Sequence, residues 1–285
     1  RYPVVHGPKP AKKAISGRKK ARGRQLARVS AVKYRETVWS DVFPGNFHTV
    51  HALQPAVRAA ENALELASQR RKRTVWRLDG GSGSEQKLRW IVKRGYHILA
   101  KGINYNRAKA LARRVRRWDP YGDTWIGEAP APKDYARPVR VFVKRRLSKD
   151  TFHYTYYVTT LSLPAKGKFM DFYNARGGSE VEQFRNDKQG LSLATRRKQD
   201  YLAQVAYVLL ADLAHNLLAD FSHKALCSSK FADYGLKRIV RDLLAIPGKL
   251  VFEGGNLRRV ELLSQKQNSE ALQKCLLKYV SGQKS

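Results

Sequence analysis

Cysteine, acidic residues and long apolar runs are scarce in this sequence, and these shortages exclude several classes of protein. The two cysteines, Cys227 and Cys275, form no CxxC pair, so the chain encodes neither a disulfide framework nor a zinc ribbon. The longest apolar run, residues 205–211, is far shorter than the roughly 20 residues that cross a bilayer. The start shows no signal-peptide pattern. We therefore expect a cytoplasmic protein without a membrane span.

Acidic residues are greatly outnumbered by basic ones. The chain has 56 Lys and Arg against 23 Asp and Glu, which gives a formal net charge of +33. Such an excess is typical of proteins with a polyanionic partner. Because the cations run along the whole chain and not along one amphipathic helix, nucleic acid fits better than a membrane surface. Hydrophobic residues still make up 42% of the 285 residues, enough to bury a core.

Composition divides the chain into segments. Residues 1–30 contain ten Lys or Arg and no acid, and we expect a basic arm over 1–24 that either contacts phosphates or is a solvated tail. Alternating strand and helix patterns over 25–101 predict the first part of an α/β core, a mixed sheet flanked by helices. The further predicted segments are a mostly β insertion at 102–165, the last part of the core with a glutamate-bearing helix at 166–226, and a helical C-terminal region at 227–285.

Turn and helix signals locate individual elements. Phe43-Pro-Gly-Asn46 predicts a type II turn that ends two strands over 25–43. Pro55 is expected in the first turn of a helix, where its missing N–H has no bond to make. Further expected elements are strands over 139–145 and 152–160, a helix over 201–226 and a hairpin at 252–256.

Asp79 is the first candidate for chemistry. It follows the expected strand Thr74-Val-Trp-Arg-Leu78 and precedes Gly80-Gly-Ser-Gly-Ser84. Carboxylates at strand ends in open α/β sheets commonly face the functional crevice, whereas an Asp before glycines is also a common turn former. Neither GxxxxGK[ST] nor a complete GxGxxG is present, so a nucleotide-binding fold is poorly supported.

Glu180 is the second candidate. Ser179 and Glu182 form a capping box, which predicts a helix start and gives Glu182 a structural role that Glu180 lacks. Cations flank Glu180 on both sides: Arg176, Arg185 and Lys188. The segment is either an ion-pair network on a solvated face or a metal ligand among phosphate-binding groups.

These two segments together resemble the cut-and-paste DDE transposases of bacterial insertion sequences. Their late signature is Tyr, two residues, Arg, three residues, Glu, six residues, Lys, and Tyr173, Arg176 and Glu180 match that spacing. The Lys position is occupied by Asp187, and Lys188 comes one residue later. The segment Arg77-Leu-Asp79-Gly-Gly resembles that of the family's second aspartate. Three other segments also resemble the family: Gly23–Val29, Phe43–Asn46 and Tyr157–Leu161.

The resemblance implies a ribonuclease-H-like fold in which two aspartates and a late glutamate bind two divalent metal ions. It assigns Asp79 and Glu180 as catalytic ligands of two Mg²⁺ or Mn²⁺ ions. The implied phosphate contacts are Tyr173, Arg176, Arg185 and Lys188. The implied activity is DNA strand cleavage and strand transfer at the ends of an insertion sequence. The implied partners are terminal inverted repeats and target DNA, bound by a homodimer associated with the nucleoid.

The family's first aspartate has no counterpart in this sequence. No acidic residue precedes Glu36, and Asp41 is better interpreted as a surface residue near a strand end. We therefore expect the printed chain to bind DNA without cutting it. The alternatives are a non-catalytic DNA-binding protein derived from a transposase, and a structural RNA-binding protein, which would explain the charge but not Asp79 and Glu180.

Two tryptophans and one histidine have competing interpretations. Trp118 and Trp125, in the expected β insertion, either stack on an extruded base or pack against neighbouring residues. His215 lies in an apolar helical stretch, where we expect a hydrogen-bonded core residue and not a metal ligand.

Overall fold

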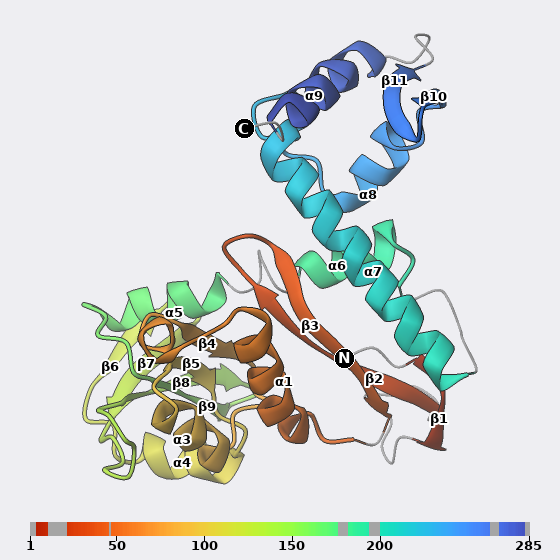
Figure 1. Cartoon of the computed structure of the whole chain (residues 1–285). Helices are drawn as coiled ribbons and strands as arrows, with labels where there is room; N and C mark the ends of the chain where they lie inside the picture. The colour runs from red at the N-terminus through yellow and green to blue at the C-terminus, as the bar shows by residue number, and fades with distance from the viewer. Residues whose placement is uncertain are drawn as a thin grey trace. The chain divides into compact units, whose positions relative to one another are not determined.

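The chain forms two compact units (Figure 1). The computed structural model describes residues 4–10, 22–45, 47–175, 182–193, 200–262 and 268–282. Unit 1 comprises Arg1–Gly45 and Ser179–Ser285, and unit 2 comprises Asn46–Gly178. The predicted segment 25–101 therefore does not form one continuous part of a single core, because it is divided between the units at residue 45.

Unit 2 is built on a mixed sheet of six strands in the order β4-β5-β9-β8-β7-β6. The strands are β4 (Val75–Leu78), β5 (His97–Lys101), β6 (Trp118–Tyr121), β7 (Thr124–Ala129), β8 (Arg140–Ser148) and β9 (Thr151–Thr159). β4 and β5 are parallel, and all other neighbours are antiparallel. The predicted mixed sheet flanked by helices is confirmed.

The predicted β insertion at 102–165 is not separate from this sheet. β9 hydrogen-bonds directly to β5, with Leu99 opposite Thr159, so the supposed insertion supplies four of the six strands. The reason lies in β5, whose central residues Ile98, Leu99 and Ala100 are completely buried. A strand buried on both faces needs neighbours on both edges to satisfy its backbone groups.

Helices cover both faces of this sheet. They are α1 (Thr49–Ala63), α2 (Ser68–Arg71), α3 (Glu85–Lys93), α4 (Tyr105–Ala112) and α5 (Lys166–Asn174). α5 packs Phe169 and Met170 against Phe142 and Tyr157 on one face, while α3 and α4 lie on the other (Figure 1). The predicted position of Pro55 is wrong: α1 begins six residues earlier, and the proline lies inside it at the cost of one helical hydrogen bond.

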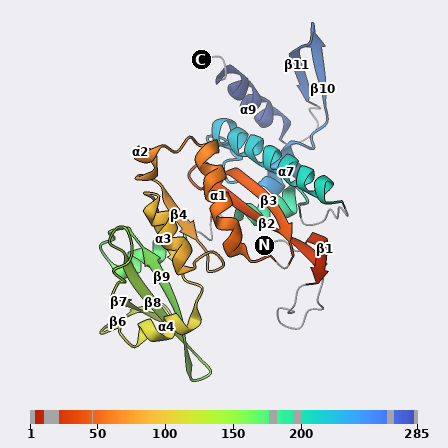
Figure 2. The same ribbon diagram turned by 60° about the horizontal axis from the view of Figure 1, so that its bottom comes forward.

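Unit 1 contains a three-stranded antiparallel sheet in the order β1-β2-β3. Its strands are β1 (Val4–Pro10), β2 (Arg22–Ala31) and β3 (Glu36–Pro44). The two expected strands over 25–43 are confirmed as a hairpin, but they pair with β1 and not with the six-stranded sheet. The predicted arm over 1–24 is thus partly wrong, because residues 4–10 form a strand. The long helix α7 (Tyr201–Phe221) runs along β3 (Figures 1 and 2).

The remaining elements of unit 1 are helical except for one hairpin. They are α6 (Glu182–Gly190), the π-helical turn η2 (Ser222–Leu226), α8 (Leu236–Arg238), the π-helical turn η3 (Ile239–Leu243), β10 (Gly248–Glu253), β11 (Asn256–Leu262) and α9 (Ser269–Gly282). The predicted hairpin at 252–256 is confirmed. Its turn residues Gly254 and Gly255 have φ of +56° and +78°, which glycine adopts without strain.

Among the described residues, one helix is long and apolar enough to cross a membrane by length and composition alone. It spans Tyr201–Leu226, and its most apolar window has a mean hydropathy of 1.4 with 28% of the window buried. The core helix of a soluble protein meets the same criteria. This helix also carries three buried polar residues, Gln204, Asp212 and His215, each bonded within unit 1.

The glycine-rich turn after β4 packs tightly on the end of β5, and this contact can be tested. A Cβ at Gly83 would overlap the carbonyl oxygen of Lys101, whereas a Cβ at Gly167 in α5 would meet nothing within 4 Å. Gly83→Ala should lower the free energy of unfolding by about 1–3 kcal/mol, as overpacking does. Gly167→Ala should leave it unchanged or raise it by about 0.5–1 kcal/mol. Equal stability of the two variants in urea unfolding would refute the tight contact.

Candidate functional site

Asp79 lies at the carboxyl end of β4, as the sequence predicts. Its side chain is exposed, and Oδ1 accepts the Gly81 N–H at 3.0 Å, while the Ser82 N–H donates to the Asp79 carbonyl at 3.2 Å. The carboxylate thus forms the turn that is common for an aspartate before glycines. One backbone bond uses only part of the lone-pair capacity of two carboxylate oxygens, so the group can also accept a cation or a proton.

Tyr173 lies beside the Asp79 turn although it is far away in sequence. It is in the last turn of α5 and is buried, and its hydroxyl donates to the carbonyl of Leu78, the residue before Asp79, at 3.4 Å. Arg77 likewise donates to the Phe172 carbonyl at 3.4 Å. The end of α5 is therefore held against the end of β4. Tyr173 is buried, and its hydroxyl donates to a backbone carbonyl. To make the predicted phosphate contact, the hydroxyl would have to turn away from that carbonyl.

The rest of the late signature is only partly described. Arg176, Ser179 and Glu180 fall outside the described residues, so the predicted pairing of Glu180 with Asp79 stays a prediction. Arg185 and Lys188 are both exposed on α6 in unit 1, on the side away from its buried residues. Their predicted phosphate contacts also stay predictions.

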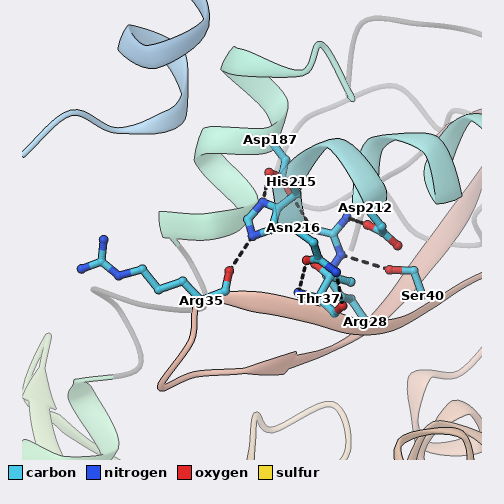
Figure 3. Close-up of polar contacts among 8 residues, drawn as sticks. All are labelled: Arg28, Arg35, Thr37, Ser40, Asp187, Asp212, His215 and Asn216. Carbon is cyan, nitrogen blue, oxygen red and sulfur yellow. Dashed lines mark hydrogen bonds and ion pairs between the residues drawn. The ribbon is translucent and has the colours of Figure 1, made fainter. Parts of the chain in front are cut away.

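Asp187, which occupies the signature's Lys position, is completely buried in unit 1. Its Oδ2 pairs with Nη1 of Arg28 from β2, and the other Arg28 nitrogen, Nη2, pairs with Asp212 of α7 (Figure 3). The Arg28 Nε donates to the Ser40 hydroxyl at 3.1 Å. One guanidinium therefore joins β2, β3, α6 and α7. Removing one member of such a buried pair typically costs about 3–5 kcal/mol.

His215 completes this network, which we call the Arg28 network (Arg28, Asp187, Asp212 and His215). The His215 Nδ1 lies 2.6 Å from the Asp187 Oδ1, and Nε2 lies 2.7 Å from the Arg35 carbonyl oxygen (Figure 3). Both partners are acceptors, so both ring nitrogens donate and the imidazole is protonated. Two cations then balance two carboxylates. The expected hydrogen-bonded core histidine is confirmed.

The pKa values in the Arg28 network follow from burial and pairing. Burial lowers the pKa of His215, but the hydrogen bond and the charge of Asp187 outweigh it, so the net pKa is raised above 6.5. Burial raises the pKa of Asp212, and the positive charge of Arg28 only partly offsets this. The network is a structural element and not a metal site, because Arg28 and His215 occupy its carboxylates.

The two tryptophans share one guanidinium. In unit 2 the Arg145 Cζ lies 4.4 Å from the ring centre of Trp118, 5.2 Å from that of Trp125 and 4.9 Å from that of Phe152. Both indoles are half-buried. Cation–π packing within the chain accounts for these contacts, and base stacking by Trp118 and Trp125 stays a prediction.

Within the described ranges, no group of three or more His, Cys, Asp or Glu side chains is arranged to hold a metal ion. Asp79 is the described member of the predicted ligand pair. Sequence reasoning missed Lys101, whose stem packs against Gly80 of the Asp79 turn, and Lys144, which lies in the same sheet two strands beyond β5. The sequence could have indicated Lys101 by its position. It is the last residue of the strand parallel to β4, at the edge of the sheet where the Asp79 carboxylate lies.

The protonation of His215 predicts how stability depends on pH. Because the folded pKa is raised, its contribution is fully present below the unfolded value of about 6.5 and is lost as pH rises through the folded pKa. The free energy of unfolding should fall by up to about 1.4 kcal/mol per pH unit in that window. His215→Gln should abolish this slope, and the exposed His153→Gln should retain it. Parallel slopes for both variants in urea unfolding between pH 6 and 9 would contradict the assignment.

Comparison with known proteins identifies no family for this chain. No model of a known protein family matches it. No curated protein matches it either. The transposase resemblance therefore depends on the residues of this chain alone.

Proposed function

We propose that the protein acts on double-stranded DNA as a DDE transposase with a ribonuclease-H-like catalytic core. The observation that carries the proposal is the hydrogen bond from Tyr173 to the Leu78 carbonyl. Tyr173 opens the late signature, and Leu78 directly precedes the aspartate of the earlier motif. The first residue of the late motif thus contacts the residue before Asp79, although Tyr173 and Asp79 are 94 positions apart in sequence.

The sheet supports the proposal at the level of architecture. Asp79 follows a strand with a parallel neighbour, and ligands of open α/β sheets bind beyond the carboxyl ends of such strands. The exposed carboxylate is fixed by the Gly81 N–H and needs no rearrangement to meet a ligand.

Asp79 fits a hard divalent cation by its chemistry, because Mg²⁺ and Mn²⁺ prefer carboxylate oxygens. Glu180 is the second proposed ligand. Two such ions, when bound, would activate the attacking oxygen and stabilise the leaving oxygen of a phosphodiester. The chain itself would orient the Asp79 carboxylate through the turn after β4, and its Lys and Arg side chains would neutralise DNA phosphates.

A non-catalytic DNA-binding protein derived from a transposase is the second candidate. The Asx-type turn favours it, because the Gly81 N–H gives the Asp79 carboxylate a structural use that needs no metal. Asparagine can form the same turn, so Asp79→Asn separates the two candidates.

DNA binding should be strongly dependent on salt. With a net charge of +33, the logarithm of the association constant should fall linearly with the logarithm of salt concentration, by about 0.9 per phosphate contacted. Fluorescence anisotropy of a labelled duplex between 50 and 300 mM salt measures this slope. A slope near zero would remove the nucleic-acid proposal.

The two proposed metal ligands should affect chemistry and not binding. In the chain extended by any natural sequence that precedes Arg1, Asp79→Asn and Glu180→Gln should each keep duplex affinity and stability but abolish Mn²⁺-dependent nicking of DNA that carries the element's ends. Glu182→Gln is the matched control: it should cost about 0.5–2 kcal/mol of stability through the capping box and leave nicking intact.

The nicking assay uses the 285-residue chain and, in parallel, the same chain with any natural sequence that precedes Arg1. Nicking that survives both Asp79→Asn and Glu180→Gln would refute the ligand assignment. Tight duplex binding without nicking in either chain would favour the second candidate.

A further inference from the structure

The β8–β9 hairpin forms a ledge beyond the carboxyl ends of β4 and β5. Lys101, the last residue of β5, is opposite Tyr157 of β9, and β9 begins earlier, at Thr151. Residues 151–155 of β9 and their partners 144–148 of β8 therefore extend past the edge at which Asp79 lies. A ligand at the Asp79 turn would lie against this ledge.

Two lysines lie on the same face of the ledge and the sheet. Lys101 comes two residues after Leu99, and Lys144 comes two residues after Phe142. Leu99 and Phe142 belong to one core cluster with Tyr173, and side chains two residues apart in a strand share a face. Both lysine side chains thus project from the face that α5 covers.

The stem of Lys101 crosses the Asp79 turn. A Cβ at Gly80 would lie 3.5 Å from the Lys101 Cδ and 3.7 Å from its Cε. The Lys101 stem therefore packs in van der Waals contact with the turn that carries Asp79.

The positive charge of this pair is not neutralised within the described part of the chain. There, neither Lys101 nor Lys144 has a carboxylate oxygen within 4 Å, and the nearby Asp123 is paired with Arg146 at 3.2 Å. Burial lowers the pKa of the half-buried Lys144, and the charges of Lys101 and Arg146 lower it further, against the opposing effect of Asp123. The two ammonium groups repel each other, and an anion between them would remove that repulsion.

We propose that Lys101 and Lys144 bind a backbone phosphate of DNA beside Asp79. The inference depends on the proposed function in taking DNA as the source of the phosphate. Lysine serves as a compact point charge for phosphates, and its flexible stem lets cations from two strands converge on one group. The site would hold the strand at the edge where the proposed metal ligand lies.

The first experiment is lysine footprinting of the full chain. An acetylating reagent that attacks neutral amines is applied to the free chain, to the chain with duplex DNA, and to the chain with 10 mM inorganic phosphate, and modification is measured by mass spectrometry. Lys101 and Lys144 should become at least about threefold less reactive with DNA. Lys93 and Lys109, on the helices that cover the other face, should change by less than about 1.5-fold. Protection by inorganic phosphate but not by DNA would overturn the proposal.

The second experiment compares matched double variants. Lys101→Gln with Lys144→Gln should reduce the magnitude of the salt slope for duplex binding by about 0.9, the value expected when the protein binds one phosphate fewer. Lys93→Gln with Lys109→Gln removes the same charge and should leave the slope unchanged. Thermal unfolding checks that both variants fold. Equal changes in the two pairs would overturn the proposal, because the effect would then reflect net charge alone.

The outcomes separate this inference from the proposed function. Protection of Lys101 and Lys144 by DNA in a protein that never nicks DNA would support the phosphate site and refute the transposase activity. Nicking that depends on Asp79, with unchanged reactivity of both lysines, would support the activity and refute the phosphate site.

Discussion

The buried guanidinium of Arg28 is the constraint on which the assembly of unit 1 depends. A charge with almost no solvent exposure is tolerated only when it is paired and hydrogen-bonded, and Arg28 finds its partners on α6, α7 and β3. The β2–β3 hairpin and the two helices therefore cannot separate without leaving charges unpaired. The backbone of Thr37 forms two further bonds between β3 and α7. Its N–H donates to the side chain of Asn216 at 2.7 Å, and its carbonyl accepts from the same side chain at 2.9 Å (Figure 3).

The same constraint accounts for the acidic residue at position 187, where the signature that this chain resembles has a lysine. The signature's cation falls at position 187, which faces Arg28 and His215 in the interior of unit 1. A lysine there would replace one of the two carboxylates and leave three positive charges against Asp212 alone in a buried site. Asp187 faces inward, and the exposed Lys188 lies one position later on the outer side of α6. Arg28 and His215 therefore favour an acidic residue at position 187, and the next residue, Lys188, is at an exposed position.

Local patterns could be predicted from the sequence, whereas pairing between distant segments could not. The β10–β11 hairpin depends on neighbouring turn residues, and the role of His215 depends on the apolar composition of one helix. Both predictions are confirmed. The partnership of β9 with β5 joins residues about 60 positions apart, and no turn signal encodes it. Pro55 misled because its missing N–H is tolerated inside α1. Asp79 was predicted from its strand end, but Lys101 becomes a neighbour of its turn only once that sheet is known.

The glycine-rich turn after β4 fixes the backbone that carries Asp79. Gly80 packs against the Lys101 stem, and Gly83 lets the turn pack on the Lys101 carbonyl, so the backbone after β4 is fixed by packing before any ligand binds. The Gly81 N–H then orients the Asp79 carboxylate through one oxygen. A group oriented in advance loses less conformational entropy on binding than a free side chain does. The bond from Gly81 is thus compatible with both candidate functions, and in the proposed transposase it would also orient the carboxylate for a ligand.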